Sequence, residues 1–186
     1  VNLDSYLMII VTGTSLSRNP SRNNVLKLME LAIKRKIEIV LDIDYREGSW
    51  NDKKKAEKTL YSASLLSNIV VGNDLEFNFM SSDKNRGLSL ASKLSKKNRI
   101  TTIYKMGSKG LYYFDKNNKH FFKSFKVKSI KPTGAGDAFI SSFCSSKLRG
   151  IELSKSIKFG AAGGAIVVTR VGCSKVMPTL LEIKEF

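Results

Sequence analysis

Residues 131–140 read KPTGAGDAFI, a stretch in which two glycines bracket one small residue and an aspartate leads into an apolar run. Glycine adopts backbone conformations that are closed to other residues and lets a ligand approach the backbone closely. The run that opens at Ala138 is typical of a buried helix, so the glycines lie where a loop becomes a helix N-terminus. Such an end carries unpaired N–H groups and a partial positive charge. The stretch therefore predicts a site for an anion such as a phosphate group.

Asp137 follows the glycines directly and would lie in the first turn of this helix. A carboxylate beside a bound phosphate does not help binding, because like charges repel. It suits a residue that takes a proton from a hydroxyl group attacking that phosphate. A purely structural role is the alternative, since an aspartate in the first turn is favourable on helix-dipole grounds alone and Gly-x-Gly is common in loops.

The length and composition fit one globular domain with a sizeable core: the chain has 186 residues, of which 42% are hydrophobic. We see no apolar run as long as a membrane span and no signal peptide at the start of the sequence. The two cysteines, Cys144 and Cys173, have neither metal-binding nor redox spacing. They are expected to be reduced thiols, which favours a cytoplasmic protein.

The net charge of +16 comes from 32 lysines and arginines against 16 acidic residues. A basic protein can bind nucleic acid, but here the lysines are scattered in small groups such as residues 34–36 and 53–55. We find neither interleaved aromatic residues nor a recognition-helix pattern. The charge therefore favours a solvated basic surface that suits anionic substrates over a nucleic-acid partner.

Short apolar runs alternate with helical patterns along most of the chain. Strands are expected at residues 6–12, 38–43, 68–71 and 100–105, and the helices between them predict a parallel sheet covered by helices. An antiparallel hairpin of residues 111–114 and 121–127, joined around Asn117 and Asn118, should follow. After the glycine-rich stretch we expect a helix ended by Gly150, a helix capped by Ser154 and a short helix capped by Thr179.

Polar clusters follow each expected parallel strand, where ligands of open α/β sheets bind. They are residues 13–15, 42–46, 72–76 and 106–110. Each cluster could also be ordinary turn chemistry or a helix cap, and Asn73 with Glu76 is nearly a capping box. Four such clusters at one edge, together with the phosphate-type helix start, favour a ligand site. Trp50 is expected to be a packing residue.

Several of these motifs together resemble the ribokinase-like sugar kinases, also called phosphofructokinase-B-type carbohydrate kinases. Residues 133–137 resemble the signature of that family, and Asn73-x-x-Glu76 matches its magnesium and phosphate motif. Residues 105–110 resemble the strand and turn before its nucleotide pocket, and residues 172–178 resemble the loop that closes over the adenine. The resemblance covers nearly the whole chain and implies ATP-dependent phosphorylation of a sugar.

The resemblance also implies roles for individual residues. Asp137 would be the general base and contact the acceptor hydroxyl, with Gly134, Ala135 and Gly136 facing the transferred phosphoryl group. Mg²⁺ would be held by Asn73 and Glu76, and the acceptor would lie near Asp42 and Arg46. Pairing of Arg46 with Asp42 or Asp44 is the structural alternative. The residues implied at the nucleotide are Lys105, Gly107, Gly110, Thr133, Gly134, Gly136 and Cys173.

Within that family, the segments at residues 13–22, 41–46 and 131–133, with Trp50, are similar to the kinases of inositol breakdown that act on 5-dehydro-2-deoxygluconate. This similarity implies a keto-deoxy sugar acid as substrate, whose carboxylate Arg46 would meet. The alternatives are a kinase for 2-keto-3-deoxygluconate or fructose, or a non-catalytic fragment that binds nucleotide. Lys131 stands where many relatives carry aspartate, which puts a potassium requirement in doubt.

The expected fold is therefore a three-layer α/β ribokinase-like fold with a parallel sheet. Compared with the family, residues 1–186 would form a single C-terminal part of the kinase domain, without the N-terminal strands and the small β-sheet lid over the sugar. The resemblance further implies a homo-oligomer for the full-length kinase.

Overall fold

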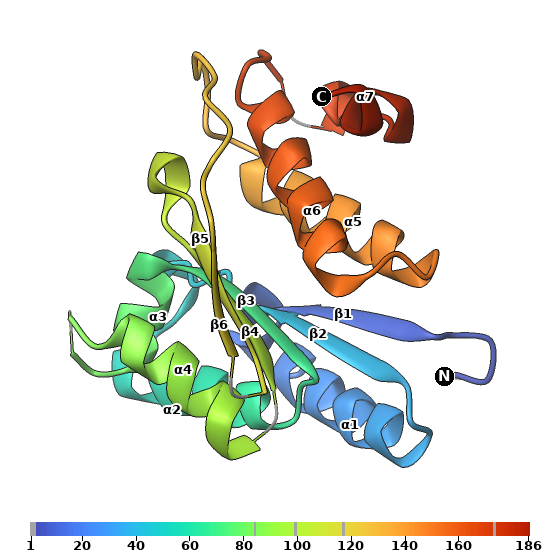
Figure 1. The fold of residues 1–186 in the computed structure, drawn as a ribbon. Helices are drawn as coiled ribbons and strands as arrows, with labels where there is room; N and C mark the ends of the chain where they lie inside the picture. Colours follow the sequence, from blue (N-terminus) through green and yellow to red (C-terminus); the bar gives the residue numbers. More distant parts are fainter. Residues whose placement is uncertain (1–2, 84, 99, 117, 173) are drawn as a thin grey trace. The chain divides into compact units, whose positions relative to one another are not determined.

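The computed structural model describes residues 3–83, 85–98, 100–116, 118–172 and 174–186 (Figure 1). The chain forms two compact units. The first contains the residues up to Gly107 and Leu111–Phe121, and the second contains Ser108–Gly110 and the residues from Phe122 onward. In the described part of the chain, no helix has both the length and the apolar character needed to cross a membrane.

The first unit alternates strands with helices. Its strands are β1 (Met8–Thr12), β2 (Glu38–Asp42), β3 (Ile69–Asn73), β4 (Thr101–Lys105), β5 (Leu111–Asp115) and β6 (Asn118–Phe122, which ends at the unit boundary). Its helices are α1 (Ser21–Lys34), α2 (Lys53–Leu65), α3 (Asp74–Met80) and α4 (Gly87–Asn98), with short 3₁₀ turns at Gly13–Leu16 and Glu47–Ser49.

The six strands form one sheet in the order β1-β2-β3-β4-β5-β6. Strands β1 to β4 are parallel neighbours, and β5 is antiparallel to β4. Parallel strands joined in sequential order by right-handed crossovers place every connecting helix on the same face of the sheet. Figure 1 shows α1, α2 and α4 along one face of this sheet. The predicted parallel sheet is confirmed, and β5 and β6 follow it as neighbouring strands of the same sheet.

The second hairpin strand was predicted too late in the sequence. It was expected at residues 121–127, but β6 spans Asn118–Phe122. Its partner β5 has only five residues, so residues beyond Phe122 would have no strand of this sheet to pair with. Residues 118–121 are exposed although they belong to β6. The apolar pattern that predicted a strand at residues 121–127 therefore does not determine which residues pair with β5.

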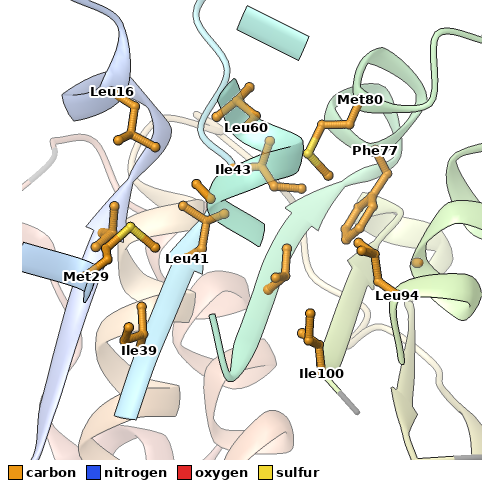
Figure 2. Close-up of a cluster of buried hydrophobic side chains, with 14 of the residues drawn as sticks. Leu16, Met29, Ile39, Leu41, Ile43, Leu60, Phe77, Met80, Leu94 and Ile100 are labelled. Atoms are coloured by element: carbon orange, nitrogen blue, oxygen red, sulfur yellow. The ribbon is translucent and has the colours of Figure 1, made fainter. Parts of the chain in front are cut away.

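The core of the first unit lies between the sheet and its helices (Figure 2). Strand β2 contributes Ile39 and Leu41, which are fully buried as expected of a strand in the middle of a parallel sheet. The helices contribute buried residues at helical spacing: Met29, Ala32, Ala56, Leu60, Ala63, Ala91 and Leu94. Trp50 is also buried in this core, as expected of a packing residue.

The second unit contains α5 (Ala135–Leu148), α6 (Leu153–Val167) and α7 (Leu180–Glu185). Helices α5 and α6 pack closely because α6 carries glycine where it faces α5. A Cβ atom on Gly163 would lie 2.3 Å from Ser142 Oγ and 2.9 Å from Ala138 O. A Cβ atom on Gly160 would lie 3.0 Å from Phe139 O. Since these carbonyls belong to the first turns of α5, this packing supports the helix start predicted to bind an anion.

The helix ends of this unit confirm two predictions and correct one. Gly150, with φ of 75°, follows the end of α5, and Thr179 caps α7 in a capping box with Glu182. The cap of α6 is Glu152, not Ser154 as predicted. The longer Glu152 side chain accepts bonds from the N–H groups of Ser154 (2.9 Å) and Lys155 (3.3 Å), and its charge suits a helix N-terminus.

Gly13 offers a direct test of the packing in the first unit. A Cβ atom there would lie 2.0 Å from Ile43 O and 2.7 Å from Leu60 Cδ2. We expect Gly13→Ala to lower the free energy of unfolding by about 1–3 kcal/mol, because backbone or core must shift to make room. Urea denaturation measures the change.

Gly48→Ala is the matched control, because a Cβ atom at Gly48 meets nothing within 4 Å. Its effect should stay within about 0.5 kcal/mol. Equal stabilities of the two variants would contradict the close contact between Gly13 and Ile43.

Candidate functional site

The carboxyl ends of the parallel strands bring predicted site residues of the first unit to one edge of the sheet. Strand β2 ends in Asp42, β3 ends in Asn73 and β4 ends in Lys105. The strand register pairs Asn73 with Lys105 and Thr12 with Asp42. The sheet edge therefore combines two acidic or amide side chains with one lysine.

Asn73 and Glu76 form a complete capping box at the start of α3. The Glu76 N–H donates to Asn73 Oδ1 (2.9 Å), and the Asn73 N–H donates to Glu76 Oε2 (2.7 Å). The structural reading of this motif is thus confirmed. The capping box fixes the Glu76 carboxylate against the end of β3 through one oxygen, and the other oxygen, Oε1, is not part of it.

Burial raises the pKa of the Glu76 carboxyl, and the charges of Asp42 and Asp44 raise it further. The Asn73 N–H bond and Lys105 lower the pKa in part. Negative charge is therefore concentrated here, with Asp42 only 8% exposed, and a bound cation would relieve it.

The side-chain oxygens at this edge of the sheet fit a metal ion that takes its remaining ligands from a substrate. Within the described residues, no group of three or more acidic, histidine or cysteine side chains is arranged to hold a metal ion. Mg²⁺ usually takes one or two carboxylates and completes its shell with phosphate oxygens and water. Glu76 and its acidic neighbours suit that arrangement better than a metal cage built from protein groups alone.

Arg46 lies in the loop after β2 and is paired with Asp44. Its Nε donates to Asp44 Oδ1 (2.8 Å), and Thr14 Oγ1 donates to Asp44 Oδ2 (2.5 Å). The pairing with an aspartate that the sequence left open is therefore present. Thr14 and Asp44 were missing from the predicted site residues, although both lie in the polar clusters that follow β1 and β2.

The second unit contains the helix start predicted as an anion site. Helices α2, α3, α6 and α7 each have an N-cap side chain that accepts a backbone N–H bond. Helix α5, like α1, has no such bond, and it begins after Gly134, which has φ of 85° and no side chain to act as a cap. A Cβ atom on Gly136 would meet nothing within 4 Å, and Asp137 is exposed in the first turn. This helix start is open to a ligand.

The remaining predicted nucleotide residues divide between the two units. Lys105 and Gly107 belong to the first unit, while Gly110 and the residues 133–137 belong to the second. Gly107 and Gly110 both have positive φ, 56° and 106°, which explains why glycine stands there. Cys173 lies outside the described residues. The structure thus brings together two groups: Asp42, Asn73, Glu76 and Lys105 in the first unit, and residues 133–137 in the second.

Comparison with solved structures defines the class of fold. The chain is similar to a double mutant of the fructokinase of Vibrio cholerae O395 with bound fructose, ADP and potassium ion, with a TM-score of 0.87 and 20% identity over 100% of this chain and 62% of that one. It is also similar to aminoimidazole riboside kinase of Salmonella enterica with its riboside and an ATP analog, with a TM-score of 0.88 and 20% identity over 97% and 62% of the two chains. The fold is ribokinase-like, as predicted.

The sequence comparison places the chain within that class. The profile of the pfkB family carbohydrate kinases matches residues 2–180, and the chain belongs to this family. A 5-dehydro-2-deoxygluconokinase of Bacillus licheniformis is 35% identical over 184 residues, which are 96% of this chain and 55% of that protein. The chain thus spans about half the length of the curated relatives it matches.

The electrostatics of Glu76 predict a pH-dependent effect of Glu76→Gln. Glutamine can keep the capping box but cannot ionise. Because the folded state raises the Glu76 pKa, ionisation of this group costs stability as pH rises from the unfolded value of about 4.3 through the folded pKa. The variant should therefore gain stability relative to the wild type across that window, measured by urea denaturation between about pH 4 and pH 8.

Glu76→Ala is the control because it removes both the charge and the side-chain bond that Glu76 contributes to the capping box. It should lose about 0.5–2 kcal/mol at low pH, where Glu76 is protonated and only the cap matters. A stability difference between Glu76→Gln and wild type that shrinks with rising pH would contradict the raised pKa.

Proposed function

We propose that the protein carrying this chain transfers the terminal phosphoryl group of ATP to a hydroxyl of a keto-deoxy sugar acid, 5-dehydro-2-deoxy-D-gluconate. The observation that carries the proposal is the start of α5, where an uncapped helix N-terminus, an open glycine and an exposed aspartate follow one another. The name of the Bacillus licheniformis relative supports this choice of substrate.

The start of α5 supplies both groups that phosphoryl transfer needs from the protein. Asp137 takes the proton of the acceptor hydroxyl as its oxygen bonds to the γ-phosphorus and the bond to the leaving ADP oxygen breaks. The N–H groups of Ala135, Gly136 and Asp137 face the charge on the transferred group. Because the Ala135 N–H already has Pro132 O at 3.3 Å, Gly136 and Asp137 are the principal donors.

Asn73 and Glu76 would hold Mg²⁺ through water molecules at the end of β3. There it would supply positive charge that offsets the charge of the phosphates. The fit rests on the partly buried Glu76 carboxyl, on the neighbouring charges of Asp42 and Asp44, and on the second Glu76 oxygen, which lies outside the capping box. The capping box keeps this carboxylate oriented, so the residues do not have to be ordered when the ion arrives.

The other predicted residues would contact the two small-molecule substrates. Asp42 and Arg46 would lie near the sugar acid, with Arg46 meeting its carboxylate. Lys105, Gly107, Gly110, Thr133 and Cys173 would flank the nucleotide. We further propose that the full-length kinase is a cytoplasmic homo-oligomer, as the family resemblance implies.

Calorimetric titration of the chain with Mg-ATP tests the anion site. The chain should bind Mg-ATP saturably, and Gly136→Val should weaken binding about tenfold or more, because its side chain would occupy the phosphate approach. The fold should tolerate the change, since the space around Gly136 is open.

Gly48→Val provides the matched control, with an equally open position in the first unit. It should leave the affinity within about twofold of wild type. Unchanged affinity in Gly136→Val would refute the anion-site reading of α5.

Asp137→Asn tests the assignment of the general base. The variant keeps the shape of the side chain but cannot accept the proton, so turnover should fall by about 10²–10⁴-fold while Mg-ATP affinity stays nearly the same. A coupled assay with 5-dehydro-2-deoxygluconate, fructose and 2-keto-3-deoxygluconate measures turnover. Near-normal turnover in the variant would contradict the assignment of Asp137 as the general base.

Mg-ATP binding without turnover by the wild type would favour the alternative of a non-catalytic nucleotide-binding protein.

A further inference from the structure

Arg46 is held by a chain of two side chains from the ends of neighbouring strands. Thr14, after β1, donates through Oγ1 to Asp44 Oδ2 (2.5 Å) and also lies 3.1 Å from the Asp44 carbonyl oxygen. Asp44, after β2, accepts the Arg46 Nε–H at Oδ1 (2.8 Å). Each oxygen of the Asp44 carboxylate therefore has its own donor, and the orientation of the carboxylate is fixed from both sides.

The loop that carries this chain of contacts is anchored on both sides of Asp44. The Ile43 N–H donates to Val71 O (2.9 Å), and Ile43 itself is fully buried. The Tyr45 ring stacks on Phe79 of α3 with centroids 3.7 Å apart. Because both neighbours of Asp44 in the sequence are fixed, its side chain cannot move with the loop as a whole.

Asp44 has an unusual backbone conformation in this position. Its φ of 30° lies in the left-handed region that residues with a side chain rarely adopt. Thr14 comes within reach because the neighbouring Gly13 approaches the Ile43 carbonyl so closely that a Cβ atom would lie 2.0 Å from it. Backbone strain of this kind persists where the surroundings impose it, and it is concentrated at functional sites.

The arrangement differs from an ordinary surface ion pair. Exposed pairs of long side chains contribute little, because ordering the side chains offsets the attraction. Here the Arg46 side chain is 71% exposed, whereas that of Asp44 is 23% exposed and held by Thr14. A guanidinium oriented in advance loses less freedom when it binds a planar anion in two-pronged fashion.

We propose that Thr14 and Asp44 are positioning residues that orient Arg46 for the carboxylate of the substrate. The inference rests on the proposed function, which assigns a sugar acid to this site, and it adds the residues that determine the preference for an acid over a neutral sugar. A role confined to joining the two loops would instead affect acidic and neutral sugars alike.

The test compares two probes that differ at the acid group, 2-deoxy-D-gluconate and 2-deoxy-D-glucose, in NMR titrations of the chain. The wild type should prefer the carboxylate probe. Thr14→Val should weaken binding of that probe by about fivefold or more and change the affinity for the neutral probe much less. Thr14→Ser, which restores the hydroxyl, should recover the preference. Asp44→Asn should show the same selective loss, and it provides an independent variant if Thr14→Val fails to fold.

Arg46→Met separates failure of this inference from failure of the proposed substrate. It should abolish the preference for the carboxylate probe, and Thr14→Val in the same chain should then add nothing. No preference in the wild type, or an unchanged preference in Arg46→Met, would overturn the sugar-acid assignment and the positioning role with it. The positioning role alone would be overturned if Arg46→Met abolished the preference but Thr14→Val and Asp44→Asn weakened binding of both probes equally. It would also be overturned if those two variants changed the binding of neither probe.

Discussion

Parallel hydrogen bonding between β1, β2, β3 and β4 is the constraint on which the first unit depends. Because the strands are in sequential order and parallel, all four carboxyl ends reach one edge, and the residues that follow them become neighbours. Asp42, Asn73 and Lys105 are distant in the sequence but share this edge. Glycine allows the loops that follow the strands to approach each other closely, as Gly13 approaches Ile43.

The same side chains serve both structure and proposed chemistry. The Asn73–Glu76 capping box completes α3 and also holds a carboxyl group in a partly buried position near Asp42 and Asp44. In the second unit α5 begins without a capping side chain, so no side chain covers its first turn from the cap position. The glycines of α6 keep that helix start supported by close packing. A stable helix with an open first turn is what an anion site requires.

The sequence was most informative where a pattern is local. Continuous apolar runs marked the parallel strands, and Thr179 and Asn73 were correctly expected to cap helices. Local patterns failed where the outcome depends on a distant partner. The extent of β6 is set by the length of β5, and Glu152 caps α6 because its side chain reaches two N–H groups, which composition alone does not reveal.

The least predictable feature is the bond between Thr14 and Asp44, which are 30 residues apart, together with the left-handed backbone of Asp44. Both arise from the approach of two loops.

The central claim, however, concerns the start of α5. The most direct measurement is an NMR titration of the ¹⁵N-labelled chain with Mg-ATP that follows the backbone amides. The account predicts that the Gly136 and Asp137 amides shift most within α5. Saturable binding that leaves both amides unmoved would contradict it.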